Sequence, residues 1–139
     1  MSERPVQVLV IEDDEAMRAM LVQMLHRLGY DVIPAANGRI ALDLLKTATP
    51  DFVITDLLMP EKDGIETILE LRRSAPSLRV IAISGGGRLS SADYLHMARK
   101  LGAVATLEKP FEREQLKAVL EQLRVSRAST EVPRSSPGR

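Results

Sequence analysis

Residues 6–14 read VQVLVIEDD, a valine-rich and almost wholly apolar run that ends in three acids. An uninterrupted apolar run suits a strand covered on both faces, as in a parallel sheet, because a strand with one wet face alternates apolar and polar residues. Apolar residues then recur at helical spacing from Met17 to Leu28, and Gly29 follows, a residue that suits the position just past a helix end. Residues 6–11 are therefore predicted to be the first strand of a parallel α/β sheet.

The same alternation of strand-like and helix-like runs continues along the chain. It predicts further strands over residues 31–34, 52–55, 79–84 and 103–108, and helices over residues 37–48, 64–75, from 90 to just before 102, and 111–125. Five βα units in succession imply a (βα)5 doubly wound fold of the α/β class. Such a fold has a five-stranded parallel sheet, right-handed crossovers and helices on both faces.

The composition of each strand predicts its place in the sheet. The first, third and fourth strands are the most apolar and belong in the middle. The second contains Pro34, which cannot donate a ladder hydrogen bond, and the fifth contains Thr106, so both belong at the edges. The order 2-1-3-4-5 of the flavodoxin-like folds meets these demands. Ligands of such sheets bind beyond the carboxyl ends of the first and third strands.

Charged and polar residues follow the ends of these central and edge strands. They are Glu12, Asp13 and Asp14 after the first strand, Asp56 after the third, Ser84 at the end of the fourth and Lys109 after the fifth. Carboxylates gathered in one place repel one another, and a cation relieves the repulsion. Oxygen-only ligands with positions left for water suit Mg²⁺. The sequence therefore predicts a Mg²⁺ site at this edge of the sheet.

One carboxylate of such a site could attack phosphorus, because aspartyl phosphate is an established covalent intermediate. Phosphoryl transfer needs mainly positioning and neutralisation of charge, which a metal, a lysine and a hydroxyl group supply. Asp56 is the nucleophile candidate because it stands alone at the tip of a central strand. Asp13, helped by Glu12, would hold the metal, whereas Asp14 is interpreted as a helix-start residue.

Four segments resemble, in order and spacing, those of the receiver domain of two-component response regulators, including single-domain chemotaxis regulators: VLVIEDD, VITDLLMPEKDG, VIAISGGG and LEKPF. The resemblance covers roughly residues 5–125. It implies the receiver fold and a protein that is not an enzyme but takes part in its own phosphorylation and dephosphorylation. Asp56 would accept the phosphoryl group from a phosphohistidine on a sensor histidine kinase or histidine phosphotransfer protein, and water would remove it.

The resemblance also implies a role for each remaining site residue. Mg²⁺ would be held by Glu12, Asp13, Asp56 and the backbone carbonyl of Leu58. The hydroxyl group of Ser84 would bond to the phosphoryl group, and Lys109 would stand at the position of the family's site lysine. Thr106 departs from the pattern, because many receivers have an aromatic residue there that swings inward on phosphorylation. The aromatic-coupled switch is therefore not expected in this protein.

Composition limits the partners and the compartment. Nineteen basic and nineteen acidic residues cancel, so there is no general electrostatic reason to bind nucleic acid. No apolar run is long enough for a membrane span. The absence of cysteine excludes disulfides and thiol catalysis and fits a cytoplasmic location. The length suggests one domain, predicted over residues 1–125, with residues 126–139, SRASTEVPRSSPGR, as a disordered tail.

Several functions remain open from the sequence. The leading one is a stand-alone signalling module that acts by docking to a downstream target or by relaying phosphate, although the chain could also be part of a longer regulator. The alternative is a receiver-fold binding module that is never phosphorylated: the complete set of acids, hydroxyl group and lysine argues against it, and Thr106 keeps it open. A Mg²⁺-dependent phosphatase of the haloacid dehalogenase type is disfavoured, because Leu58 stands where such enzymes have a second aspartate. A flavodoxin is disfavoured by the scarcity of aromatic residues.

Overall fold

The three-dimensional structure is a computed structural model, which describes residues 5–56, 64–84, 96, 99–100, 102–109 and 111–135. Side chains are described for these residues except 64–67, 84 and 125–135. The strands are β1 (Gln7–Ile11), β2 (Asp31–Ala35), β3 (Phe52–Asp56), β4 (Arg79–Ser84) and β5 (Ala105–Glu108). The helices are α1 (Glu15–Arg27), α2 (Gly38–Leu44), α3 (Gly64–Ser74) and α5 (Arg113–Ser135). The helix predicted between residues 90 and 102 lies mostly outside the described residues.

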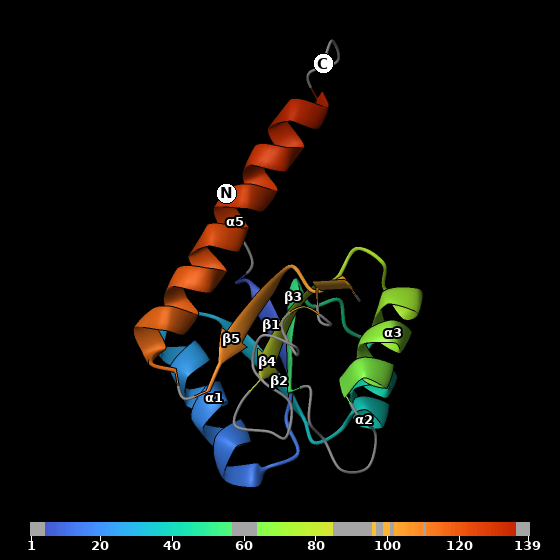
Figure 1. Ribbon diagram of the computed structural model, residues 1–139, viewed down its shortest axis with the longest axis vertical. Coiled ribbons are helices and arrows are strands. Elements are labelled where there is room, and N and C mark those ends of the chain that lie inside the picture. Colours follow the sequence, from blue (N-terminus) through green and yellow to red (C-terminus); the bar gives the residue numbers. More distant parts are fainter. Residues whose placement is uncertain are drawn as a thin grey trace.

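The strands form one parallel sheet in the order β2-β1-β3-β4-β5, which confirms the predicted doubly wound fold. Helices α1 and α5 lie on one side of the sheet, and α2 and α3 lie on the other (Figure 1). The sheet register also sets up the acidic edge. Ile11 pairs with Thr55 across β1 and β3, so the next residues along the two strands, Glu12 and Asp56, come side by side.

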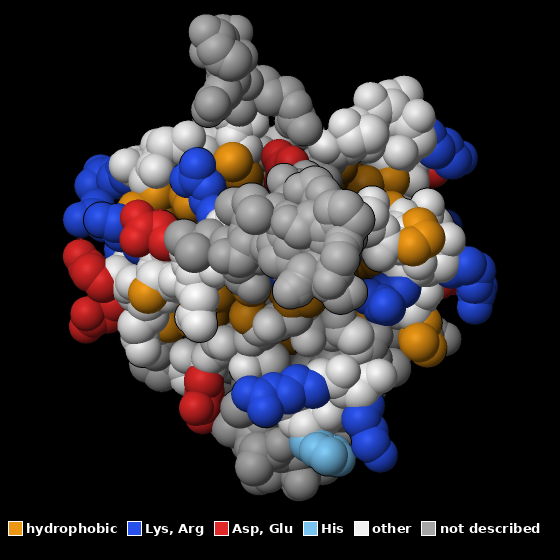
Figure 2. All heavy atoms as spheres, turned by 90° about the horizontal axis from the view of Figure 1, so that it is seen from above, with side chains coloured by type: hydrophobic (Ala, Val, Ile, Leu, Met, Phe, Trp, Pro, Cys, Tyr) orange, Lys and Arg blue, Asp and Glu red, His pale blue; other side chains and the backbone are white. Residues whose placement is uncertain are grey.

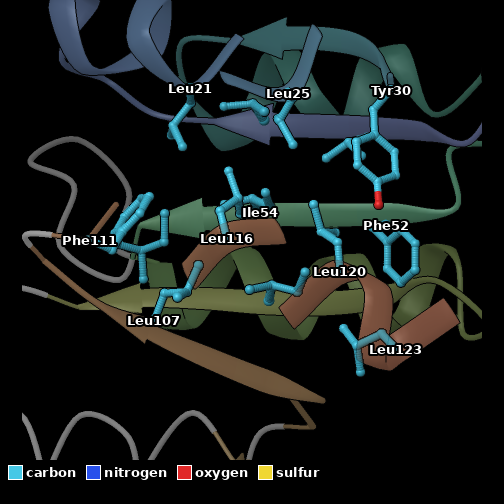
Figure 3. Packing of buried hydrophobic residues seen from close by; sticks show 14 residues of the cluster. Leu21, Leu25, Tyr30, Phe52, Ile54, Leu107, Phe111, Leu116, Leu120 and Leu123 are labelled. Atoms are coloured by element: carbon cyan, nitrogen blue, oxygen red, sulfur yellow. The ribbon is translucent and has the colours of Figure 1, made fainter. Parts of the chain in front are cut away.

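Two apolar cores explain why the central strands are apolar throughout. Val8 and Val10 of β1 face the core shared with α1 and α5, whereas Leu9 and Ile11 face the core shared with α2 and α3. Figure 3 shows the first of these cores, in which side chains of α1 and α5 point toward the strands. Its labelled members are Leu21, Leu25, Tyr30, Phe52, Ile54, Leu107, Phe111, Leu116, Leu120 and Leu123. Together the two cores fix the strand ends that carry the acids.

Helix α5 differs from the sequence prediction. It continues to Ser135, well past Val125, where the sequence analysis placed its end. In Figure 1 its last turns project beyond the rest of the protein. The physical reason is local, because residues 126–135 contain good helix formers such as Ala128 and Glu131, and the helix breaker Pro133 comes only near the end. The division into a receiver domain at 1–125 and a tail at 126–139 stays a prediction.

The described surface carries charges of both signs. Figure 2 shows basic and acidic side chains scattered over one face, with hydrophobic side chains between them. This agrees with the balanced count of nineteen basic and nineteen acidic residues. Among the helices of the described residues, none combines the length and the apolar character that crossing a membrane demands.

Candidate functional site at the carboxyl edge of the sheet

Three carboxylates meet where β1 and β3 end. Oxygen atoms of Glu12, Asp13 and Asp56 all lie within 4.8 Å of one another. Glu12 and Asp56 are buried, with only 1% and 5% of their surface exposed, whereas Asp13 is exposed. The predicted gathering of acids at this edge is therefore present, and the exposed Asp13 leaves the cluster open to solvent on one side.

Lys109, in the turn after β5, is the cation of the site. Its Nζ lies 2.8 Å from Oδ2 of Asp56 and 3.7 Å from Oε1 of Glu12. Burial acts to lower the pKa of Lys109, but the hydrogen bond and the charge of Asp56, with the charges of the other acids, outweigh it and raise the pKa above its ordinary value. Lys109 is thus held as an ammonium group beside the carboxylate of Asp56.

Glu12 differs from a surface acid in the environment of its two carboxylate oxygens. The pKa of Glu12 is raised from 4.5 to about 7, mainly by burial and also by the charge of Asp56. The hydrogen bond from the backbone N–H of Asp14 to Oε2 at 3.1 Å and the charge of Lys109 act in the opposite direction. The other oxygen of Glu12, Oε1, is buried and accepts no hydrogen bond from the described residues. A buried carboxylate oxygen of this kind is stabilised by a cation.

The turn that presents these acids is held by backbone contacts. The N–H of Glu12 donates to the carbonyl of Ala35 at 3.0 Å, which continues the β1–β2 ladder by one residue. Asp14 is the N-cap of α1, and its carboxylate accepts from the N–H of Met17 at 2.7 Å. The interpretation of Asp14 as a helix-start residue is confirmed. The chain therefore passes from strand to helix within the acidic turn.

The remaining predicted site residues are placed only in part. Ser84 ends β4 and pairs with Glu108 of β5, which brings its backbone to the same edge of the sheet, but its side chain lies outside the description. Leu58 lies outside the described residues altogether. Thr106 pairs with Ala82 within the sheet and is half-buried.

Sequence reasoning did not anticipate the role of Arg18 in the structure. Its Nη1 donates to the backbone carbonyl of Glu12 at 2.9 Å. The contact joins a strand end to the first turn of the next helix, so neither strand nor helix periodicity reveals it.

The donor set fits Mg²⁺. Three carboxylates in reach of one another, one of them with a buried oxygen that lacks a hydrogen bond, offer the hard oxygen ligands that this ion prefers. Glu12, Asp13 and Asp56 would hold the ion. Lys109 contributes a positive charge to the same cluster, but at 3.7 Å its ammonium group does not donate a hydrogen bond to Oε1 of Glu12.

Fold and site together define a doubly wound α/β protein with a cluster of three acids at its switch point. Residues 8–121 match the response regulator receiver domain. The chain belongs to this family.

Similar proteins include members of several kinds. Sporulation initiation phosphotransferase F of Bacillus subtilis strain 168 is 31% identical over 110 residues, which are 79% of this chain and 86% of that protein. Response regulator MprA of Mycolicibacterium vanbaalenii is 36% identical over 119 residues, 86% of this chain but only 50% of that protein. The chain spans 23% of the DNA-binding transcriptional regulator NtrC of Azospirillum brasilense. It therefore corresponds to only part of several larger relatives.

Solved structures show the same fold. The chemotaxis protein CheY4 of Vibrio cholerae superimposes with a TM-score of 0.77 at 28% identity, covering 86% of this chain and 98% of that one. NtrX of Brucella abortus superimposes with a TM-score of 0.84 at 27% identity, covering 94% of this chain and 30% of that one. The architecture is thus shared by short receivers and by receivers within longer proteins.

Glu12→Gln is expected to stabilise the metal-free protein at alkaline pH. Since folding raises the pKa of Glu12 from 4.5 to about 7, the folded state binds this proton more tightly, and stability is lost as the pH rises through that interval. Between about pH 4 and pH 8 the wild type should lose up to about 3 kcal/mol in the free energy of unfolding through Glu12, and the variant should not. Urea unfolding without metal across this pH range measures it. Glu15→Gln, at an exposed acid of α1, is the control, and equal pH dependence of Glu12→Gln and wild type would contradict the prediction.

Proposed function

We propose that this protein is a phosphorylatable receiver of a His-to-Asp phosphorelay, with Asp56 as the phosphoacceptor. The observation that carries the proposal is the pairing of Asp56 with Lys109 at 2.8 Å inside the cluster of Glu12 and Asp13. A nucleophilic carboxylate, an ammonium group and two further acids for a metal are the parts that phosphoryl transfer to an aspartate requires.

In the proposed reaction, an oxygen of Asp56 forms a bond to phosphorus as the bond from phosphorus to the donor's histidine nitrogen breaks, and the imidazole leaves. Glu12, Asp13, Asp56 and the backbone carbonyl of Leu58 would hold a Mg²⁺ ion, which would neutralise the phosphoryl charge. Lys109 donates a hydrogen bond to a transferred phosphoryl oxygen. The hydroxyl group of Ser84 donates another. Water later attacks phosphorus, which regenerates the carboxylate and releases phosphate.

Two features bear on how such a reaction would use these groups. Asp56 is only 5% exposed whereas Asp13 is exposed, so we propose that the donor approaches Asp56 from the side of Asp13. Lys109 is already oriented at Asp56, so its charge needs no rearrangement before transfer. The protein thereby takes part in its own phosphorylation, with no separate substrate to turn over.

A groove along α1 supports the proposed partner class. It has a volume of about 770 Å³ and is lined by residues of the acidic-edge end of α1, such as Glu15 and Arg18, and by apolar side chains including Met20 and Pro34. Met20 is 39% exposed. We propose that a sensor histidine kinase or a histidine phosphotransfer protein docks here in the cytoplasm, which brings its phosphohistidine to the open side of the pocket. A downstream target protein would read the phosphorylated state.

Intact mass after incubation with a small acyl phosphate tests the function. Gain of one phosphoryl group that requires Mg²⁺ and disappears with a chelator is the expected result. A folded protein that binds Mg²⁺ but gains no mass would overturn it. That outcome would favour the alternative binding module, for which the half-buried Thr106 in β5 is the specific observation, since it is too small to act as the family's aromatic switch residue.

A further inference from the structure

Arg18, which lines the groove along α1, also contacts the turn that carries the acids of the site. It lies in the first turn of α1, where its backbone N–H donates to the carbonyl of Asp14 at 2.9 Å. Its half-buried side chain turns back toward the end of β1, and Nη1 donates to the carbonyl oxygen of Glu12 at 2.9 Å. A charge-assisted hydrogen bond of this length is among the stronger kinds in proteins.

The carbonyl that Arg18 binds is part of the peptide unit that joins Glu12 to Asp13. A peptide unit is planar, so fixing the direction of its carbonyl also fixes the direction of the Asp13 N–H and the position of the Asp13 Cα. On the far side of Asp13, the N–H of Asp14 is held by Oε2 of Glu12 at 3.1 Å. Asp13 is exposed, and its backbone is thus anchored immediately before and after it.

We infer that Arg18 is a positioning residue for the metal-binding acids: it locks the peptide plane between Glu12 and Asp13 so that both carboxylates meet one cation. The inference rests on the proposed function, because it concerns the same Mg²⁺ site. A positioning role and a purely electrostatic role of Arg18 predict opposite changes in the affinity for Mg²⁺ when the side chain is removed. The guanidinium group of Arg18, bonded to the carbonyl of Glu12, carries a positive charge that repels Mg²⁺, so loss of its charge alone would tighten metal binding. Loss of positioning would weaken it.

The variant Arg18→Met distinguishes the positioning role from the electrostatic role. It keeps an unbranched, mainly apolar stem in place of the arginine side chain and removes both the donors and the charge. The affinity of the unphosphorylated protein for Mn²⁺, used alone as a spectroscopic stand-in for Mg²⁺, is expected to fall by about tenfold, as is usual when a group that orients a ligand is lost. Electron paramagnetic resonance of free Mn²⁺ measures this affinity without any phosphorylation. Unchanged or tighter binding would overturn the inference.

Two further variants complete the test. Arg18→Lys keeps the charge but loses the planar donor geometry, so a smaller loss of Mn²⁺ affinity in the same direction is expected. Arg27→Met removes the same charge from the exposed C-terminal turn of α1 and should bind Mn²⁺ like the wild type. If Arg18→Lys matches the wild type while Arg18→Met binds more tightly, Arg18 acts through charge and the inference fails.

Amide exchange provides a readout that needs no metal. In Arg18→Met, the N–H of Asp14 should exchange with solvent about tenfold faster than in the wild type, because its partner Glu12 is no longer fixed. The N–H of Met17, which donates to Oδ2 of Asp14 within the helix cap, is the internal reference. A wild type that binds no Mn²⁺ would refute the proposed function, and the exchange rate of Asp14 would then decide the role of Arg18 by itself.

Discussion

Asp56→Asn is expected to abolish phosphorylation by a small acyl phosphate, with a rate at least about 100-fold below that of the wild type. An amide has no carboxylate oxygen to attack phosphorus. Glu12 is placed less well than Asp56, because it is buried and lies 3.7 Å from Nζ of Lys109, whereas Asp56 lies 2.8 Å from it. Intact mass against time, at saturating Mg²⁺, measures the loss.

The variant should remain folded, because Asp56 pairs with Ile83 through the backbone register of β3 and β4. Circular dichroism and thermal unfolding check this point. Asp43→Asn is a matched control, since it makes the same chemical change at a surface acid of α2 that pairs with Lys46 at 3.4 Å. It should gain the phosphoryl group at the wild-type rate. An Asp56→Asn protein phosphorylated as fast as the wild type would show that another residue is the acceptor.

Lys109→Met is expected to reduce the rate of phosphoryl transfer by about 100-fold at saturating Mg²⁺, the usual cost of removing one fixed group that stabilises developing charge. The ammonium group lies 2.8 Å from Asp56, so it is placed to hold a phosphoryl oxygen as the new bond forms. The same change should leave metal affinity equal or tighter, because the positive charge that shares the pocket with the ion is removed. A fall in rate without a fall in affinity is therefore the signature of this role.

Single-turnover phosphorylation and Mn²⁺ titration give the two quantities separately. Lys46→Met is the control, because Lys46, in the turn after α2, forms an exposed ion pair with Asp43, and the change should alter neither quantity. If Lys109→Met lost metal affinity and transfer rate to the same extent, Lys109 would act by shaping the metal site and not by stabilising the transferred group.

The sequence predicted the sheet well because its signals were local and strong. β1 reads as an unbroken apolar run, since successive residues such as Val10 and Ile11 face different cores on the two sides of the sheet. Pro34 and Thr106 correctly marked the two edges. The end of α5 was missed because residues beyond Val125 have helix-forming ability without apolar periodicity, and the prediction relied on periodicity.

The acidic cluster could be predicted because parallel strands end at one edge, so the topology alone brings Glu12 beside Asp56. The finer geometry could not. The different exposures of the three acids and the raised pKa of Glu12 depend on how the surrounding chain packs. The hydrogen bond from Arg18 to Glu12 depends on the angle at which α1 leaves β1, for which the sequence has no periodic signal.

The course of α5 has a practical consequence for handling this protein. The helix starts after the carboxyl end of β5 and is anchored in the core by Leu116 and Leu120. It runs back past the sheet, so its projecting end lies away from the acidic edge (Figure 1). At 1.5 Å per residue, residues 126–135 extend about 15 Å. A fluorophore or a surface tether attached near Ser135 would therefore leave the pocket facing free solution, which suits optical and immobilised binding assays.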